Sequence, residues 1–293
     1  MLTGEYVVLD GALSLALPTQ YGQCLIIKPI AENKISWKSL DDKGNVWFEE
    51  IFSFQNGILK LVNDENEISN RLFQILQIAK QLNTDFLNGS KGFKVESRLS
   101  FPREWGLGSS STLINNIASW AKVDAFKLLE LTFGGSGFDI ACAQNDSAIT
   151  YQLQENKRNI CKVEFNTEFK ECLYFIYLNK KQNSREGIER YKKNTSNLSN
   201  EISEISSITS RIIDCKLLSE FESLINQHEA IISNIINQLP VKERLFKDFK
   251  GSIKSLGAWG GDFILTTSKE NPTDYFKSKG FQTIIPYSQM IKK

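Results

Sequence analysis

The sequence predicts a mixed α/β (α+β) protein organised as two lobes. Three observations support this fold class. The chain has 293 residues, which is long for a single hydrophobic core. Short strand-like runs are interspersed with stretches of helical periodicity. The composition then changes to a polar, Asn- and Ser-rich helical stretch over residues 184–240. We expect the boundary near residues 167–171, giving lobes of residues 1–168 and 169–293.

The first lobe is predicted to begin with a strand over residues 4–11, because aromatic and β-branched residues run into Asp10-Gly11. An amphipathic helix is predicted over 66–82, where apolar residues recur at helical spacing. A helix opened by residues 106–111 is expected to run to about 121 and a second helix to cover about 124–132. A glycine turn over 134–137 then leads into residues 138–143. The remaining strands of this lobe are expected at 23–30, 34–38, 46–52, 92–101, 147–153 and 160–165.

The second lobe is predicted to open with an apolar strand over residues 172–178. Two helical stretches with apolar stripes follow, over 198–213 and 217–239. The chain then continues with a helix, a glycine turn over 257–261, a strand over 263–267, a short helix after Pro272 and a last strand near 281–285.

Composition excludes several classes of protein. The formal net charge of +1 creates no field that would attract nucleic acid or an acidic membrane. No apolar run approaches the roughly 20 residues that span a bilayer. The five cysteines are scattered without a C-x-x-C pair, and His228 is the single histidine, so a metal cluster is not expected. We expect a cytoplasmic protein with reduced thiols, as a monomer or homodimer, with no nucleic-acid or membrane partner.

One glycine- and serine-rich segment has the context of an anion-binding loop. Gly106-Leu107-Gly108-Ser109-Ser110-Ser111 follows a predicted strand and opens a predicted helix. The first N–H groups of a helix are unpaired and point outward, and the helix dipole favours a negative charge there. The loop matches neither the Walker nor the Rossmann pattern. A plain glycine-serine turn is the alternative, but Pro102 and three consecutive serines favour phosphate binding.

Three segments in this order resemble the motifs of the GHMP kinases (galactokinase, homoserine, mevalonate and phosphomevalonate kinases). The central one is Pro102-x-x-x-Gly106-Leu107-Gly108-Ser109-Ser110. Residues 4–12 resemble the first motif, with Tyr6 where a histidine is commoner, and residues 255–263 resemble the third. The resemblance spans nearly the whole chain. It implies an N-terminal α/β lobe that binds ATP and a C-terminal ferredoxin-like lobe.

The resemblance also implies roles for individual residues. Ser136-Gly137-Phe138-Asp139 is similar to the segment that carries the catalytic aspartate of mevalonate-type kinases; alternatively, Asp139 caps the helix that begins there. Glu130 and Ser110 are the candidate magnesium ligands, although Glu130 could equally be a solvated helix carboxylate. The implied nucleotide-binding residues are Gly106, Leu107, Gly108, Ser109, Ser110 and Ser111.

The implied substrate-binding residues are Glu5, Tyr6, Ser136, Ser184 and Arg185. Arg185 could bind a carboxylate or phosphate with its guanidinium, or could simply be solvated. The implied glycine motif consists of Gly257, Ala258, Gly260 and Gly261. Trp259 and Asp262 replace small residues there, which leaves open how this turn supports the phosphates. His228 is expected to be a packed or surface residue of a helix.

The family's lysine partner of the aspartate would lie upstream of Gly4, which leaves open whether the native chain starts before Met1. The favoured function is phosphorylation of mevalonate or phosphomevalonate by ATP with Mg²⁺, in isoprenoid biosynthesis. The alternatives are a nucleotide-binding protein with little kinase activity, a kinase for homoserine or a sugar, and a relative of mevalonate-diphosphate decarboxylase.

Overall fold

The computed structural model describes residues 1–55, 58–62, 66–89, 91–155, 157–181, 184–194, 197–259 and 261–292. The side chains of residues 184, 185 and 194 lie outside this description. Within it, strands and helices are mixed throughout, which confirms the predicted α/β class. The chain divides into a first unit, Tyr21–Arg103 with Leu107–Gln144, and a second unit, Met1–Gln20 with Glu104–Gly106 and Asn145–Lys293.

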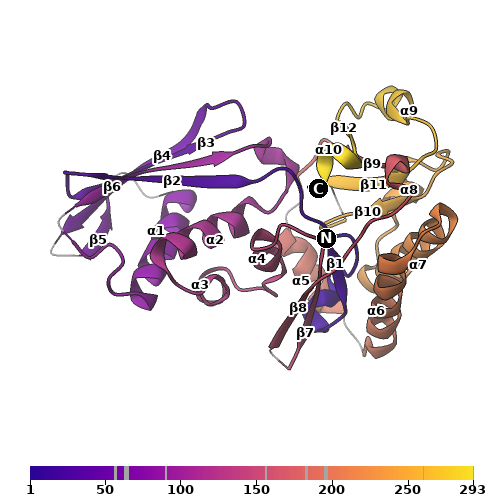
Figure 1. Ribbon diagram of the computed structural model, residues 1–293, viewed down its shortest axis with the longest axis horizontal. Coiled ribbons are helices and arrows are strands. Elements are labelled where there is room, and N and C mark those ends of the chain that lie inside the picture. The colour runs from indigo at the N-terminus through magenta and orange to yellow at the C-terminus, as the bar shows by residue number, and fades with distance from the viewer. Residues whose placement is uncertain are drawn as a thin grey trace. The chain divides into compact units, whose positions relative to one another are not determined.

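The first unit is built on a five-stranded sheet whose order is β2-β6-β3-β4-β5. Neighbouring strands are antiparallel except β3 and β6, which run parallel. Figure 1 shows the helices of this unit along one face of the sheet. The bounds are β2 Gln23–Ile30, β3 Lys34–Leu40, β4 Val46–Gln55, β5 Ile58–Leu61, α1 Glu67–Leu82, β6 Gly92–Leu99, α2 Ser109–Ala121, α3 Ala125–Thr132 and α4 Phe138–Ala143.

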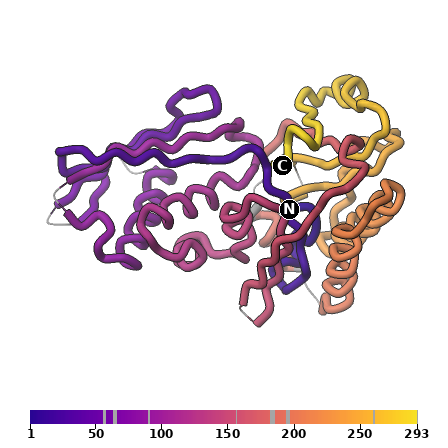
Figure 2. Tube along the Cα trace, in the orientation of Figure 1, coloured from indigo at the N-terminus to yellow at the C-terminus, as the bar shows by residue number. Residues whose placement is uncertain are grey.

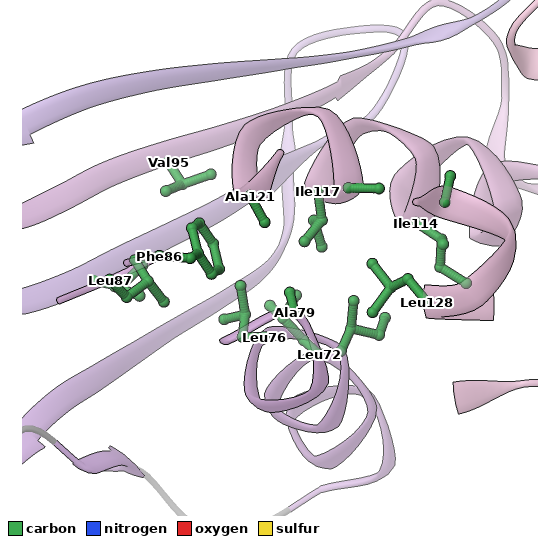
Figure 3. Close-up of a cluster of buried hydrophobic side chains, with 14 of the residues drawn as sticks. Leu72, Leu76, Ala79, Phe86, Leu87, Val95, Ile114, Ile117, Ala121 and Leu128 are labelled. Carbon is green, nitrogen blue, oxygen red and sulfur yellow. The ribbon is translucent and has the colours of Figure 1, made fainter. Parts of the chain in front are cut away.

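The core of the first unit forms where the helices meet the sheet. Leu72 and Leu76 of α1 point toward Ile117 of α2, and Val95 of β6 lies above them (Figure 3). Asn66 starts α1 by accepting hydrogen bonds from the N–H groups of residues 68 and 69. The apolar stripe predicted for residues 66–82 is confirmed from Leu72 to Ala79, which form the buried face of α1, whereas Ile68 and Leu82 at its ends are exposed.

The second unit contains two further sheets. One has the order β1-β7-β8 and the other β10-β11-β9-β12, and all their strand pairs are antiparallel. Helices α6 and α7 pack on each other. The strands are β1 Ser14–Ala16, β7 Ile149–Gln154, β8 Lys157–Lys162, β9 Leu173–Tyr177, β10 Ile253–Ser255, β11 Phe263–Thr267 and β12 Ile284–Pro286. The helices are α5 Ser184–Asn194, α6 Ser199–Asp214, α7 Leu218–Ile236, α8 Val241–Leu245, α9 Thr273–Ser278 and α10 Tyr287–Met290, and 3-10 turns cover Val7–Asp10, Arg103–Trp105 and Lys170–Cys172.

The strand predicted over residues 4–11 is wrong. Val7–Asp10 form a 3-10 helix, and the N–H of Val7 donates to the carbonyl of Glu5 at 2.8 Å, which closes a tight turn at Tyr6. Val7 and Val8 are almost fully buried. Their apolar side chains therefore serve core packing, and their backbone does not pair in a sheet. The pairing is made instead by β1, which the sequence analysis did not predict.

The two units also differ from the consecutive lobes 1–168 and 169–293. Residues 14–16 pair with residues 149–151, so the N-terminal segment and the β7–β8 hairpin belong to the same unit as the C-terminal residues. Figure 2 shows the indigo N-terminal segment beside this hairpin. Sheet pairing over a long sequence separation leaves no local signal, which is why composition did not reveal it. All five cysteines are free. Among the described residues, no helix has the length and apolar character needed to cross a bilayer.

Candidate active site

The predicted anion-binding loop opens a helix, as expected. Gly108 is the N-cap of α2, with a φ of 73° and no side-chain cap. The N–H groups of Ser111 and Thr112 both donate to the Gly108 carbonyl at 3.1 Å. A Cβ on Gly108 would meet no atom within 4 Å, so there is space for a side chain at this position. Glycine is favoured here because the backbone is left-handed. The start of α2 is thus a helix N-terminus with open space at its cap, the geometry that suits a phosphate.

Hydrogen bonds to strand β2 fix the start of α2 on the sheet. The Thr112 hydroxyl donates to Oε1 of Gln23 at 2.6 Å, and the Asn116 side-chain amide donates to the Gln23 carbonyl at 3.0 Å. Ser110 is exposed to solvent in the first turn of the helix. Its hydroxyl is therefore presented by a helix that cannot shift easily along the sheet.

Asp139 lies in the first turn of α4 and does not cap it. The N-cap is Gly137, with a φ of 83°, and the N–H of Phe138 donates to the Ser136 hydroxyl at 3.2 Å. Phe138 and Ile140 on either side are buried, which fixes the short helix. The Asp139 side chain keeps access to solvent, but desolvation by the surrounding protein raises the pKa of its carboxyl. Helix α4 packs on α2. The alternative that Asp139 is a helix cap is therefore wrong, and a catalytic role stays a prediction.

Glu130 is an exposed residue of α3, where its carboxylate accepts from Lys127 at 2.8 Å. Helices α2 and α3 pack on each other, so Ser110 and Glu130 belong to neighbouring helices. No cluster of three or more His, Cys, Asp or Glu residues suited to a metal occurs in the described ranges. Hydroxyl and carboxylate oxygens suit Mg²⁺, which proteins commonly bind through one or two such groups together with substrate phosphates. The donor chemistry of the predicted pair therefore fits magnesium.

Tyr6 is the centre of a tight turn with unusual backbone angles, a φ of 66° and a ψ of −56°. Together with the hydrogen bond from Val7 N–H to Glu5 O, these angles define a γ-turn of the strained, positive-φ kind. The Tyr6 ring stacks on Tyr191 of α5 with 5.6 Å between the ring centroids. Burial, and secondarily the charge of Glu5, raises the pKa of Tyr6 to about 12, so its hydroxyl stays protonated at neutral pH.

The other predicted acceptor-side residues lie in the first turn of α5, which starts at Ser184. The side chains of Ser184 and Arg185 fall outside the described residues. The structure nevertheless brings this turn to Tyr6, because the Tyr6 hydroxyl lies where a side chain on Gly187 would be. Two segments about 180 positions apart in the chain, both predicted to bind substrate, are therefore in contact.

Glu5 takes part in a buried cluster of ionisable groups. Its carboxylate accepts from Lys254 Nζ at 2.8 Å, and Lys254 also lies 3.4 Å from Glu229. The Ser255 hydroxyl donates to Glu229 at 2.8 Å, and His228 Nε2 accepts from the Gly4 N–H at 2.9 Å. The side chains of Glu5, Lys254 and His228 are at most 2% exposed, and that of Glu229 is 5% exposed. Glu5 is thus enclosed in the protein, and its predicted contact with substrate stays untested.

Burial sets the ionisation of two members of this cluster. Burial raises the pKa of Glu229 to about 7, although Lys254 opposes the shift. Burial also holds the pKa of His228 well below its ordinary value, which agrees with its Nε2 acting as an acceptor. The sequence predicts that His228 is a packed or surface residue of a helix, and in the structure it is fully buried. Lys254, Glu229 and Ser255 were not predicted, and only the position of Ser255 and Lys254 beside the third motif could have suggested them.

The glycine motif forms a turn between β10 and β11. Gly257 has a φ of 60°, Ala258 is buried, and Gly260 lies outside the described residues. A Cβ on Gly261 would come within 2.2 Å of the Lys180 carbonyl, so this position has no room for a side chain. Trp259 is fully buried in the apolar cluster that contains Tyr6 and Tyr191.

The Asp262 side chain is packed against the first glycine of the predicted phosphate loop. A Cβ on Gly106 would lie 2.2 Å from Oδ1 of Asp262. Asp262 is 8% exposed, and its backbone N–H donates to the Lys180 carbonyl at 2.6 Å. The two large residues of the third motif therefore lie in different surroundings. The Trp259 indole is packed in the apolar cluster with Tyr6 and Tyr191, and the Asp262 carboxylate lies beside Gly106.

Comparison with solved structures identifies the fold. The mevalonate kinase of Methanococcus jannaschii matches with a TM-score of 0.67 at 17% identity, over 97% of this chain and 93% of that one. The Streptococcus pneumoniae phosphomevalonate kinase, in complex with phosphomevalonate and AMPPNP, matches with a TM-score of 0.67 at 14% identity, over 95% and 92%. A D-glycero-D-manno-heptose 1-phosphate kinase from Bacteriodes thetaiotaomicron matches with a TM-score of 0.65 at 13% identity, over 100% and 92%.

No protein-family model and no curated protein sequence matches the chain. The structural matches cover nearly the whole chain and come from kinases with different acceptors. They confirm that the protein has the two-lobe GHMP kinase fold. Identities of this size establish the fold alone, because one fold can carry several activities.

Proposed function

We propose that this protein is an ATP-dependent kinase of the GHMP type that phosphorylates a small acceptor, with mevalonate and phosphomevalonate as the first candidates. The observation that carries the proposal is the pairing of α2 and α4. Helix α2 opens at a glycine cap with free space, and the neighbouring α4 presents an exposed aspartate from its first turn. A phosphate-binding loop beside a carboxylate is what phosphoryl transfer to a hydroxyl requires.

In this proposal the nucleotide phosphates bind along Gly106–Ser111. Backbone N–H groups and the Ser109, Ser110 and Ser111 hydroxyls donate to phosphate oxygens, and the dipole of the 13-residue helix α2 favours their charge. Asp139 orients the acceptor hydroxyl and accepts its proton as the oxygen attacks the γ-phosphorus. The bond from that phosphorus to its bridging oxygen then breaks and ADP leaves.

The acceptor is proposed to bind at the first motif and the first turn of α5. Tyr6, Ser184 and Arg185 are the proposed contacts there. Ser136, in the segment that carries Asp139, is proposed separately as a substrate-binding residue. Glu5 is proposed to stabilise the γ-turn at Tyr6 through its buried ion pair with Lys254. Gly257, Ala258, Gly260 and Gly261 are proposed to support the nucleotide side, because glycines allow close approach of the backbone to phosphates.

Magnesium is the proposed companion of ATP, with Ser110 and Glu130 as the residues that would hold it. When bound, it neutralises charge on the β- and γ-phosphates. The Ser110 hydroxyl is solvent-exposed and can supply a ligand oxygen directly, whereas Glu130 first has to leave its surface pair with Lys127. Such a surface pair contributes little, about 0–1 kcal/mol, so the exchange is energetically feasible.

A second function is favoured by one observation. Asp262 places a carboxylate against Gly106 at the start of the predicted phosphate loop, where like charge disfavours a triphosphate. This arrangement favours a nucleotide-binding protein with little kinase activity. Kinases for homoserine or sugars, and a relative of mevalonate-diphosphate decarboxylase, are further candidates within the same fold. A cytoplasmic location and a monomeric or homodimeric state remain predictions.

The experiment that tests the proposal is a screen for ATP turnover with product masses. Purified protein is incubated with ATP, Mg²⁺ and mevalonate, phosphomevalonate, homoserine or a sugar phosphate. The proposal predicts ADP release that depends on one acceptor, with a product heavier by one phosphoryl group. Tight nucleotide binding without acceptor-dependent turnover would support the second function instead. A product that has lost carbon dioxide would indicate the decarboxylase.

A further inference from the structure

The Tyr6 side chain lies against Gly187, with its hydroxyl oxygen as the nearest atom. A Cβ built on Gly187 would lie 2.5 Å from the Tyr6 hydroxyl oxygen, but 3.2 Å and 3.3 Å from the ring carbons Cε1 and Cζ. Separations under 3 Å between a Cβ and another heavy atom require something to move. The phenolic oxygen therefore occupies the space that any side chain at position 187 would need.

The phenol cannot easily give way, because three features hold the ring. The γ-turn fixes the backbone of Tyr6 in a strained conformation. The ring stacks on Tyr191, whose hydroxyl donates to a carboxylate oxygen of Asp10. The residue before Tyr6 is anchored by the buried pair of Glu5 and Lys254. Strained turns of this kind persist only where the surrounding structure determines them, and they are concentrated at functional sites.

We propose that Tyr6 is a positioning residue: its hydroxyl sets the place of the first turn of α5 by packing on Gly187. The relevance of this turn to the acceptor rests on the proposed function, because Ser184 and Arg185 begin the same helix. The Glu5–Lys254 pair holds the γ-turn from the buried side and Tyr191 holds the ring from α5 itself. The contact between Tyr6 and Gly187 therefore fixes the position of the first turn of α5, which contains Ser184 and Arg185.

A double-mutant cycle on unfolding tests the contact. Alanine in place of glycine inside a helix ordinarily stabilises it. Here Gly187→Ala should instead lower the melting temperature by about 2–4 °C, because the new methyl group meets the phenol. In the Tyr6→Phe background the same change should leave the melting temperature unchanged or raise it, since only the ring carbons beyond 3 Å remain. This reversal of sign is the expected result.

A second measurement tests whether the contact positions α5. Hydrogen exchange of the α5 amides should speed up in Gly187→Ala and return toward the wild-type rate in the double variant, with the amides of α7 as the internal control. If the wild type turns over an acceptor, Gly187→Ala should raise the acceptor KM at least 5-fold without changing nucleotide affinity.

Three results would overturn the inference. A stabilising Gly187→Ala in the wild-type background would show that there is no close contact. An equal loss in both backgrounds would show that the phenolic oxygen is not what the methyl group meets. An unchanged exchange of α5 amides would show that the contact positions nothing. If no acceptor is turned over, the proposed kinase function fails, and the thermal cycle and the exchange data still decide whether Tyr6 fixes α5.

Discussion

At the scale of single residues, the chemistry follows from which polar groups are exposed and which are enclosed. Ser110 and Asp139 are both presented to solvent by helices whose neighbouring residues are fixed on the core of the first unit. Glu5, by contrast, was predicted to contact substrate and is found in a buried pair with Lys254. Burial thus separates groups that could meet a ligand from groups that hold the framework.

The Ser110 hydroxyl gives the first prediction at this scale. Ser110→Ala removes a hydrogen-bond donor to the phosphates and a candidate oxygen ligand of magnesium. Loss of a hydrogen bond to a charged group typically costs about 1–3 kcal/mol, which corresponds to a 5- to 150-fold weaker use of Mg-ATP. The measurement is the KM for ATP and the nucleotide affinity of the variant. Ser119→Ala, at the exposed far end of the same helix, is the control and should behave as wild type.

At the scale of elements, α7 shows what periodicity can and cannot predict. The apolar stripe predicted over residues 217–239 is confirmed as the buried face of Leu218–Ile236. The same face carries His228 and Glu229, whose partners lie near residue 5 and on β10. A local pattern identifies the buried side of a helix, but not partners more than 200 residues away. The cluster could therefore not be derived from the helix alone.

The buried cluster predicts a pH dependence of stability. The pKa of Glu229 is about 7 in the fold, against an ordinary value near 4.5. The folded protein therefore holds a proton that the unfolded chain has lost, and this contribution is present below pH 4.5 and disappears as the pH rises through 7. Relative to Glu229→Gln, the wild type should lose up to about 3 kcal/mol of unfolding free energy between pH 5 and pH 8.

Denaturant unfolding of both proteins across this range measures the difference. His228 acts in the opposite direction, because its neutral form is favoured in the fold, and it destabilises the protein below about pH 6.5. This effect is common to both proteins and cancels in the comparison. Glu220→Gln, at the surface of the same helix, should run parallel to the wild type. If the unfolding free energy of Glu229→Gln also ran parallel to that of the wild type across this pH range, the raised pKa of Glu229 would be contradicted.

At the scale of the whole molecule, the sequence motifs predicted more than the local patterns did. The fold class and the GHMP kinase fold were predicted correctly, because three motifs in order constrain the topology over nearly the whole chain. The boundary near residues 167–171 stays a prediction, while β1 pairs with β7 across more than 130 residues, a contact that no local pattern signals. The sequence predicts a strand where the γ-turn at Tyr6 lies, because the apolar residues around Tyr6 resemble those of a strand. The contact of Tyr6 with Gly187 carries no sequence signal, since a glycine in a helix looks merely unfavourable.

The central claim is that the loop at α2 binds nucleotide while Asp139 performs the transfer. Asp139→Asn tests it most directly, because asparagine keeps the shape and removes the charge and the base. We expect turnover to fall by roughly 100-fold or more, as for the loss of a positioned general base, while nucleotide affinity survives in the same preparation. Asp146→Asn, at an exposed carboxylate that pairs with Lys292, is the control and should change neither quantity. Turnover retained in Asp139→Asn would contradict the mechanism, and loss of nucleotide binding would contradict the separation of the two roles.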